Sequence, residues 1–574
     1  MHTPQSTAFA RWTVVIALVA MILGPTAGLR PVSAQDARSL DRAAPIWSLI
    51  PADATLVTAI NTDPDSAQWP IAADLLEAGG LENLVYGAIN EFLLSAELST
   101  SNLDPAQSSI LGGTIALAAW GAPSDPTDNA ALYVSASDPE AAFQSLKAQF
   151  LTETGPNVVE GEIPGGRSAV STEESVSIML INDVVVFTEL DDAELVARLV
   201  TGSGPSLATF QPFADVMAAQ PDELIARAYF NGPAAGMNTA DVLTSLFGVS
   251  VSQLALLLSV AGPVATTFTS LGLTAATDGF HLRTAQLPAP LIGPELPGSG
   301  PAESLAGSIS NEADVYLEGT DLGATPIAAQ VISSIAIALA GRDGGTWAEY
   351  GQRPEDWAFD RFRELTGIDL RAELIDQLKG DYQAAFAPNS TLNPTFFDMV
   401  LQSELDDPEV VRGLIEKLTV LIRLSLAGRP DFGEMTSINI GEDVLHTLAI
   451  APSTGSPSIE IMFGVIAGQL RITVGDGADR FLDPQPADTL SADPQYRAAF
   501  AALPTKRGSR VYLDLADLLP ILGVTSLNPP DNWSGPGSED ATIEEIKAVA
   551  GIYYQDNGLA IADFVVLIQG EPIP

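Results

Sequence analysis

The chain has 574 residues, of which 72 are acidic, 26 are lysine or arginine and none is cysteine. Its formal net charge of −46 works against binding to nucleic-acid phosphates and to anionic membrane surfaces. The lack of cysteine excludes disulfides and a lipid-modified cysteine. Charged residues are only 17% of the chain, so the acidic excess is a shortage of bases. This composition indicates an acidic protein kept apart by self-repulsion, rather than a salt-adapted or cation-collecting surface.

Residues 1–34 have the pattern of a secretory signal peptide. Arg11 precedes an uninterrupted apolar run over residues 12–23, which a Gly-Pro pair ends. The sequence Val-Ser-Ala at 32–34 then puts small residues where a signal peptidase cuts. We therefore predict cleavage directly after this segment and a secreted, periplasmic or cell-envelope location. The alternative is an uncleaved anchor, because the uncharged stretch 13–29 approaches the length that spans a bilayer.

Two later apolar stretches are candidates for membrane spans. Residues 322–341 carry no charge, but they include Pro326, Gln330 and several hydroxyl side chains that are costly in hydrocarbon. Residues 254–268 are too short and contain a Gly-Pro pair. We expect both to be buried helices, so the mature chain has no predicted membrane span.

One segment of the chain occurs in two similar copies. Residues 207–231 and 490–514 align without gaps, and Arg227 and Tyr229 recur 283 positions later. Apolar residues four positions apart in both copies indicate one face of a helix, and the alternating run that follows indicates a strand. The acidic pair Asp-Glu at 222–223 is not kept in the second copy. The repeated features are therefore steric and not chemical.

A second repeated segment predicts the start of a helix. Residues 137–150 and 406–418 share the sequence Asp-Pro-Glu. The aspartate is a favourable N-cap, proline suits the first helical position, and glutamate meets the positive end of the helix dipole. Further matches keep the same order, with offsets between 267 and 285.

The repeats predict an α+β protein made of two tandem homologous domains, each a largely antiparallel sheet with packed helices. We place the first domain at residues 45–287 and the second at 303–574, joined by a Pro/Gly-rich linker at 288–302. Tight turns are predicted at 182–183, at Asp-Gly 278–279 and at Asn-Gly 557–558.

Three soft motifs resemble a bacterial exported family that is known only as a domain of unknown function. They are Pro-Ala-Asp-Ala at 51–54, Asn-Thr-Asp at 61–63, and the helices that begin with Asp-Pro-Glu. The resemblance would cover residues 45–574. It implies no catalytic residues, because none are assigned to that family.

The residues that carry common chemistries are scarce. His2 leaves with the signal peptide, and we expect His281 and His446 to be ordinary strand residues, too few for a zinc site. The chain has no G-x-S-x-G, S-x-x-K or P-loop motif. The acidic segments 61–66 and 475–483 do not fit a calcium-binding loop. We therefore predict no catalytic residue, no cofactor and no metal.

The second copy carries an insertion at residues 341–362 that is rich in aromatic residues among glycines and charges. Exposed aromatic side chains on such a segment can contact a partner. The candidate partner contacts are Trp347, Tyr350 and Trp357. The alternative is that Trp357, Phe359 and Phe362 attach the start of a helix to the core.

These observations favour an exported, non-catalytic protein that binds a ligand or a protein partner, or has a structural role in the cell envelope. The alternative is a carboxylate-dependent hydrolase, for example of polysaccharide, with one degenerate copy. Such an enzyme needs two acids with separated pKa values in one pocket. The abundance of acidic residues makes a pair of this kind unrecognisable in the sequence.

If the insertion is a partner surface, the double substitution Trp347→Ala and Trp357→Ala should weaken partner capture without lowering the melting temperature. Pull-down and thermal unfolding of the variant measure the two effects. Unchanged capture would contradict an aromatic contact surface.

Overall fold

The structure is a computed structural model of the chain. It describes most of the residues after the first 44 and leaves several internal segments aside. The described residues are 45–63, 65–78, 112–122, 125–154, 158–171, 175–235, 267–288, 300–325, 354–388, 397–426, 435–450, 459–516, 518, 526–527, 541–542 and 546–568.

The chain divides into two units. Unit 1 comprises Met1–Pro294 together with Thr525–Ile546 and Asp556–Pro574. Unit 2 comprises Glu295–Val524 and Lys547–Gln555. Near its C-terminus the chain therefore contributes to both units.

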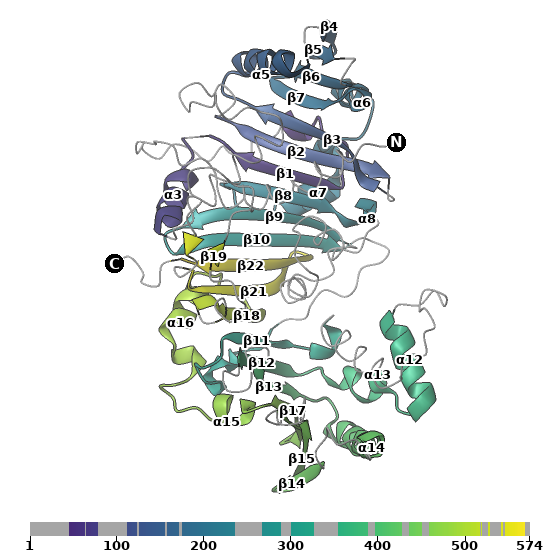
Figure 1. Ribbon diagram of the computed structural model, residues 1–574, viewed down its shortest axis with the longest axis vertical. Helices are drawn as coiled ribbons and strands as arrows, with labels where there is room; N and C mark the ends of the chain where they lie inside the picture. The colour runs from purple at the N-terminus through teal and green to yellow at the C-terminus, as the bar shows by residue number, and fades with distance from the viewer. Residues whose placement is uncertain are drawn as a thin grey trace. The chain divides into compact units, whose positions relative to one another are not determined.

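In the described part of unit 1, eleven strands pair antiparallel in the order β4-β5-β6-β7-β3-β2-β1-β8-β9-β10-β22 (Figure 1). Their bounds are β1 Leu56–Asn61, β2 Thr114–Ala122, β3 Asp125–Ser135, β4 Val158–Ile163, β5 Gly166–Ser171, β6 Val176–Ile181, β7 Val184–Glu189, β8 Ala226–Asn231, β9 Thr267–Ala276, β10 Gly279–Pro288 and β22 Leu559–Leu567. A separate pair is formed by β19 Ser526–Leu527 and β20 Ala541–Thr542.

Helices cover both faces of this sheet. Trp69 on one helix packs with Ala226 and Leu273 on one face, whereas Phe213 contacts Trp47 and Tyr229 on the other. Phe143 anchors a further cluster against the strands that include β6 and β7. The helices of unit 1 are α3 Gln68–Ala78, α5 Pro139–Thr154, α6 Leu190–Val200, η3 Leu207–Thr209, α7 Gln211–Met217 and α8 Gly232–Ala235.

Nine strands of unit 2, among the residues described, pair antiparallel in the order β14-β15-β16-β17-β13-β12-β11-β18-β21 (Figure 1). Their bounds are β11 Val315–Thr320, β12 Asp381–Pro388, β13 Phe397–Glu404, β14 Thr436–Ile440, β15 Asp443–Ile450, β16 Ile459–Ile466, β17 Gln469–Val474, β18 Ser509–Asp514 and β21 Ala548–Asp556.

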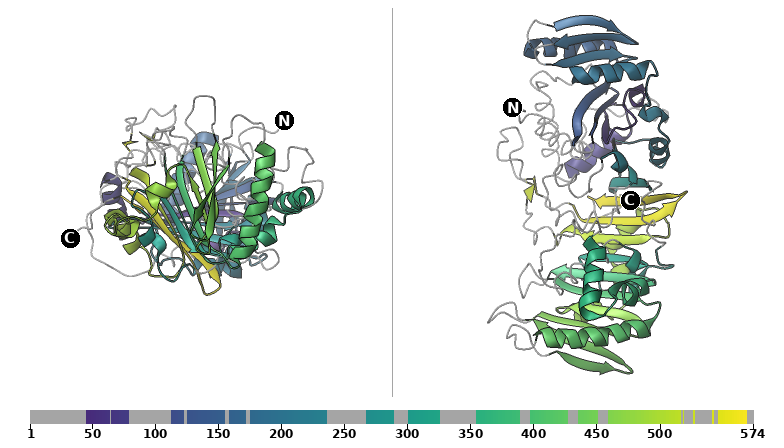
Figure 2. Two further views of the ribbon diagram at one scale, coloured as in Figure 1. Left: turned by 90° about the horizontal axis from the view of Figure 1, so that it is seen from below. Right: turned by 90° about the vertical axis from the view of Figure 1, so that its right-hand side faces the viewer.

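The longest helix of unit 2, α14, lies against the strands β16 and β17 (Figure 2). Its Val411 and Ile415 pack with Val465 and Leu470 in one core cluster. The helices of unit 2 are η5 Leu305–Ser308, η6 Leu322–Ala324, α12 Pro354–Thr366, α13 Leu370–Glu373, η8 Ile375–Gln377, α14 Pro408–Leu426, α15 Gly477–Phe481, η9 Leu490–Ala492 and α16 Pro494–Ala501.

The predicted helix starts are confirmed. Asp138 Oδ1 accepts a hydrogen bond from the backbone N–H of Ala141 at 3.0 Å, at the start of α5. Asp407 does the same for Val410 at 3.3 Å, at the start of α14. In both helices proline takes the first position, where its missing N–H costs no hydrogen bond.

Two of the three predicted turns lie where the sequence places them. Asn182 and Asp183 have φ of 47° and 67°, and Asn557 and Gly558 have φ of 51° and 82°. These values suit the two-residue turns of hairpins. The turn of the first-copy hairpin lies one residue earlier than predicted, because Gly279 already pairs with Ala276 as the first residue of β10.

The two units share one strand order. In each, the first strand (β1 or β11) pairs with the second strand on one side and with β8 or β18 on the other. In each, the third strand pairs with the last strand of a four-strand meander. The isolated bridge between Pro51 and Ser206 in unit 1 has a counterpart between Ser310 and Thr489 in unit 2.

The predicted α+β class, with antiparallel sheets and packed helices, is confirmed. Descent of the units from one duplicated domain, and the boundaries at 45–287 and 303–574, remain predictions. None of the described helices is long and apolar enough to cross a membrane. Residues 326–341, predicted as most of a buried helix, lie outside the described residues.

Candidate functional site

The predicted aromatic contact surface is largely outside the described residues. Trp347 and Tyr350 are not among them, and Trp357 lies in α12 at a position whose side chain is not described. Phe359 and Phe362, by contrast, are buried in a cluster with neighbouring apolar residues. For these two phenylalanines, the alternative of a helix attached to the core is confirmed.

His281 and His446 lie in strands, as predicted. His281 Nε2 lies 2.9 Å from Asp278 Oδ1 in unit 1, and His446 Nδ1 lies 3.0 Å from Ser437 Oγ in unit 2. Within the described part of the chain, no group of three His, Cys, Asp or Glu side chains is placed to hold a metal ion.

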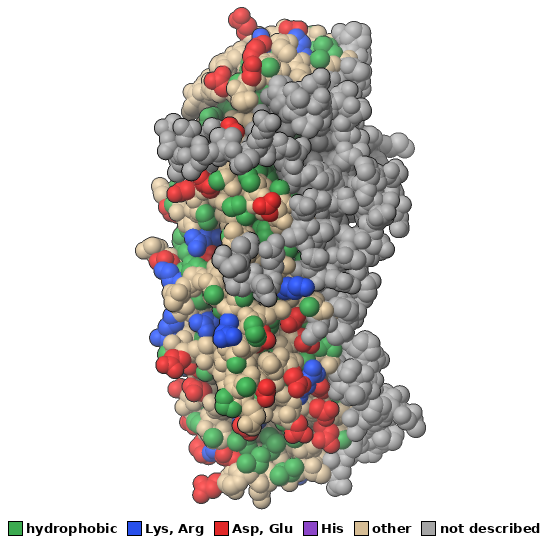
Figure 3. Space-filling model, turned by 90° about the vertical axis from the view of Figure 1, so that its left-hand side faces the viewer, with side chains coloured by type: hydrophobic (Ala, Val, Ile, Leu, Met, Phe, Trp, Pro, Cys, Tyr) green, Lys and Arg blue, Asp and Glu red, His purple; other side chains and the backbone are tan. Residues whose placement is uncertain are grey.

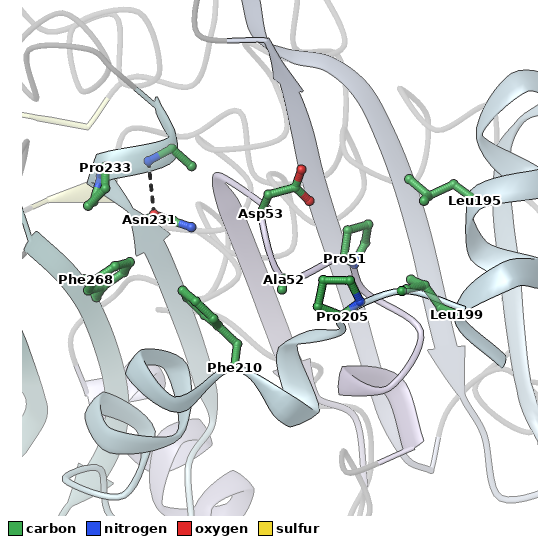
Figure 4. A pocket seen from close by; sticks show the side chains of 12 residues that line it. Pro51, Ala52, Asp53, Leu195, Leu199, Pro205, Phe210, Asn231, Pro233 and Phe268 are labelled. Carbon is green, nitrogen blue, oxygen red and sulfur yellow. Dashed lines mark hydrogen bonds between the residues drawn. The ribbon is translucent and has the colours of Figure 1, made fainter. Parts of the chain in front are cut away.

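A hollow of about 520 Å³ in unit 1 brings together four distant segments of the chain (Figure 4). The residues that line it come from the segment before β1, from α6 and the loop after it, from the end of β8 with the following α8, and from the start of β9. They are Pro51, Ala52, Asp53, Leu195, Leu199, Gly204, Pro205, Phe210, Asn231, Pro233, Ala234 and Phe268.

The lining is apolar with two polar side chains. Asp53 is exposed and makes no ion pair with a described residue, so its carboxylate is open to solvent or to a ligand. Asn231 is buried, and its Oδ1 accepts a hydrogen bond from the N–H of Ala234 at 3.1 Å. This bond turns the amide nitrogen of Asn231 toward the side of the hollow where Asp53 lies (Figure 4).

The corresponding place in unit 2 holds an ion pair. The bridge partners Pro51 and Ser310 put Asp53 and Glu312 at the same position, two residues further along the chain. In unit 2, Arg480 on α15 binds Glu312 with its Nε 3.1 Å from the carboxylate. In unit 1, the helix that follows the meander, α6, instead presents leucines to Asp53.

A second polar feature is a row of side chains across the sheet of unit 2. Strand register places Arg471, Gln402, Gln383, Glu318 and Arg510 opposite one another on five neighbouring strands. The Nε2 of Gln383 donates to the Oε1 of Gln402 at 2.8 Å. An Nη1–H of Arg510 donates to the Oε1 of Glu318 at 3.1 Å.

The side chain of Glu318 is fully buried, and four donors hold it. Its Oε2 accepts from the hydroxyls of Tyr316 and Ser304 and from the N–H of Leu305, at 2.8, 3.1 and 2.6 Å. Burial, together with the Glu318 charge, raises the pKa of Tyr316 well above its ordinary value. The same two causes raise the pKa of Tyr496 to about 12. The tyrosines therefore stay protonated as donors around this carboxylate.

The matching row in unit 1 has the arginine without the carboxylate. Register places Arg227 opposite Ala59, which in turn lies opposite Ala116. Arg227 is only 6% exposed, and its Nη1 has no hydrogen-bond partner among the residues that the structure describes. Repetition of the arginine and tyrosine was visible in the sequence, but the exchange of Glu318 for Ala59 was not, because the two strands share no residue pattern.

The comparisons with known proteins give a family and no activity. The family model described as "Protein of unknown function (DUF3352)" matches residues 111–550. The chain belongs to the DUF3352 family. The predicted membership of a family of unknown function is thereby confirmed, and the match spans residues of both units.

No curated protein matches this DUF3352 chain. One solved structure, titled "Structure of crystal form III of TP0453", is similar over 48% of this chain and 83% of that chain. Its identity is 11% and its TM-score is 0.21, which is too low to support an argument about fold or function.

Sequence reasoning found the residues of the hollow only in part. Pro-Ala-Asp-Ala at 51–54 was noticed as a family signature, but nothing marked Asp53 as the polar group of a cavity. Leu199, Phe210 and Phe268 are apolar residues of the kind that ordinarily fills a core. Only the fold of this DUF3352 chain shows that they surround open space.

Removing the buried carboxylate of unit 2 should strongly destabilise the protein. Glu318→Gln leaves Arg510 without a counter-ion and is expected to cost about 3 kcal/mol of unfolding free energy in a urea titration. Glu312→Gln is the matched control, since its exposed ion pair with Arg480 is worth roughly 0.5 kcal/mol. Equal small losses in both variants would contradict a structural role for Glu318.

Proposed function

We propose that this chain is an exported, non-catalytic binding module whose unit 1 holds an apolar ligand with a cationic group in the hollow beside Asp53. The observation that carries the proposal is an apolar cavity with one open carboxylate at its lining. A cavity of about 520 Å³ is within the size range of small-molecule sites, which are mostly apolar with a few polar groups.

The polar groups of the hollow decide the charge of the ligand. Asp53 attracts a cation, and its attraction is stronger beside apolar walls than in bulk water. The amide nitrogen of Asn231 offers one further hydrogen-bond donor to an uncharged acceptor on the ligand. Apolar contact with Phe210, Phe268 and the leucines of α6 supplies the larger part of the binding free energy.

Unit 2 supports a division of roles between the units. Where unit 1 has Phe210 and Asn231, the repeated sequence has Asp493 and Asp514, and Arg480 pairs with Glu312. We propose that the units are tandem homologous domains, at 45–287 and 303–574 with a linker at 288–302. The shared strand order and the shared bridge between segments support this descent.

The hydrolase alternative finds less support in the hollow. Hydrolysis of a glycosidic bond needs two carboxyl groups in one site. Among the residues that line the hollow, Asp53 is the one carboxylate. The surface formed by Trp347, Tyr350 and Trp357 remains a second proposed contact, for a protein partner.

Among the described residues on the face that Figure 3 shows, acidic side chains lie singly or in small groups, between uncharged side chains and some lysines and arginines. This distribution supports the interpretation that the net negative charge is spread over the surface and keeps copies of the protein apart. Asp53 therefore differs from other acidic residues in its apolar surroundings and not in its charge.

A simple probe pair tests the hollow: n-octylamine against n-octanoate at neutral pH, measured by calorimetry. We expect the ammonium form to bind more tightly, because Asp53 attracts it and repels the carboxylate. Asp53→Asn should weaken octylamine binding by a factor of about five, the size of a partly exposed ion pair. Phe210→Ala should weaken both probes.

The control variants make the same kinds of substitution at residues that do not line the hollow. Asp191→Asn removes an exposed carboxylate on α6 that does not line the hollow, and Phe397→Ala removes a partly exposed ring in unit 2. Neither should alter binding. Equal affinity of octylamine for the chain and for both Asp53→Asn and Phe210→Ala would contradict the proposed site.

Export can be tested independently of any ligand. Mass spectrometry of the protein produced by a secreting bacterial host should show a mature chain that begins at Gln35. A chain that retains residues 1–34 and sediments with membranes would instead support the uncleaved anchor.

A further inference from the structure

Among the described residues of unit 1, one buried cation has no counter-ion. Arg227 lies on β8, is 6% exposed, and makes no hydrogen bond or ion pair with a described residue. Burial lowers the pKa of Arg227 to about 10, so the group still carries its charge at neutral pH. Removal of an unpaired charge from water is strongly unfavourable, so a folded protein ordinarily balances it.

Unit 2 shows how the same position is balanced. Arg510 on β18 lies opposite Glu318 on β11, and the two side chains form an ion pair at 3.1 Å. Arg227 on β8 lies opposite Ala59 on β1. Unit 1 therefore keeps the arginine and replaces its carboxylate with a methyl group.

The neighbours of Arg227 do not supply the missing negative charge. The guanidinium carbon lies 5.9 Å from the centre of the Trp47 ring, a contact that attracts a cation weakly. Gln220, whose amide oxygen lies over Gly272 opposite Arg227, is neutral. Ala59 and Ala116, the next two positions of the row, are buried and carry only methyl groups.

A second buried donor lies on the same face of the strand. Tyr229 is two residues after Arg227, so both side chains leave β8 on one side of the sheet. The Tyr229 hydroxyl is also buried without a hydrogen-bond partner. Burial raises the pKa of Tyr229 above its ordinary range, so the hydroxyl keeps its proton and can donate.

We propose that unit 1 binds a small carboxylate anion at Arg227, in the place that the Glu318 carboxylate occupies in unit 2. A guanidinium matches the two oxygens of a carboxylate with two parallel N–H donors. We choose formate and acetate as the candidate anions, because the smallest carboxylates need the least space beside an arginine that is only 6% exposed. This anion site is independent of the hollow beside Asp53, which selects a cation.

The test follows the melting temperature of the mature protein as sodium formate or sodium acetate is added to a chloride-free buffer. The melting temperature of the natural sequence should rise and saturate, because a ligand that binds only the folded state stabilises it. Arg227→Met should remove the saturable rise. Arg227→Lys keeps the charge but loses the fork of donors, and should raise the apparent dissociation constant about tenfold.

Two further variants separate this site from general salt effects. Ala59→Glu supplies a carboxylate opposite Arg227, and should remove the formate response while keeping the melting temperature at or above that of the natural sequence without formate. Arg510→Met lowers the melting temperature but should keep the response. A response that does not saturate, or one that Arg227→Met retains, would overturn the proposal.

Discussion

An arginine at one position of the sheet is the constraint on which much else in this protein depends. Arg227 and Arg510 occupy the same register position of β8 and β18, beside the first strand of each unit. Arg227 is only 6% exposed, and the partly exposed Arg510 pairs with a fully buried carboxylate, so in both units a charge that is removed from water has to be balanced nearby. The groups opposite each arginine, more than the arginines themselves, distinguish the two units.

In unit 2, side chains of the protein itself balance the charge of the arginine. Glu318 accepts from Arg510, from two hydroxyls and from a backbone N–H, and amide side chains continue the row across the sheet. A second arginine of this unit, Arg480, forms ion pairs with Glu312 and Asp398. In unit 1, Ala59 lies opposite Arg227, and the described residues supply no carboxylate to balance that arginine. Leucines of α6 lie near Asp53 and line an apolar hollow. The two units thus differ in the residue opposite the arginine and in the surroundings of Asp53 and Glu312.

Much of the fold could be predicted from local chemistry. Asp138 and Asp407 predict helix starts because aspartate is a favoured N-cap, proline suits the first helical position and the glutamate that follows meets the positive end of the dipole. Asn182-Asp183 and Asn557-Gly558 predict hairpins, because a two-residue hairpin turn needs positive φ and few residues other than Asn, Asp and Gly tolerate it. The edge hairpin β4–β5 was missed, because its strands alternate polar and small residues with few buried positions. The turn before Gly279 was misplaced by one residue because Asp-Gly also occurs at a strand start.

The candidate sites could not be predicted in the same way, since each depends on pairs of residues far apart in the sequence. Arg227 and Ala59 are 168 positions apart, and only strand register makes them neighbours. The hollow joins residues from 51 to 268 that are individually ordinary.

The single most direct test is a high-resolution crystal structure of the mature protein grown with formate. The account predicts that the strands of the two units superpose with Arg227 on Arg510, and that planar density for a carboxylate lies at Arg227 alone. A carboxylate side chain of the same chain against Arg227, or units that do not superpose, would contradict it.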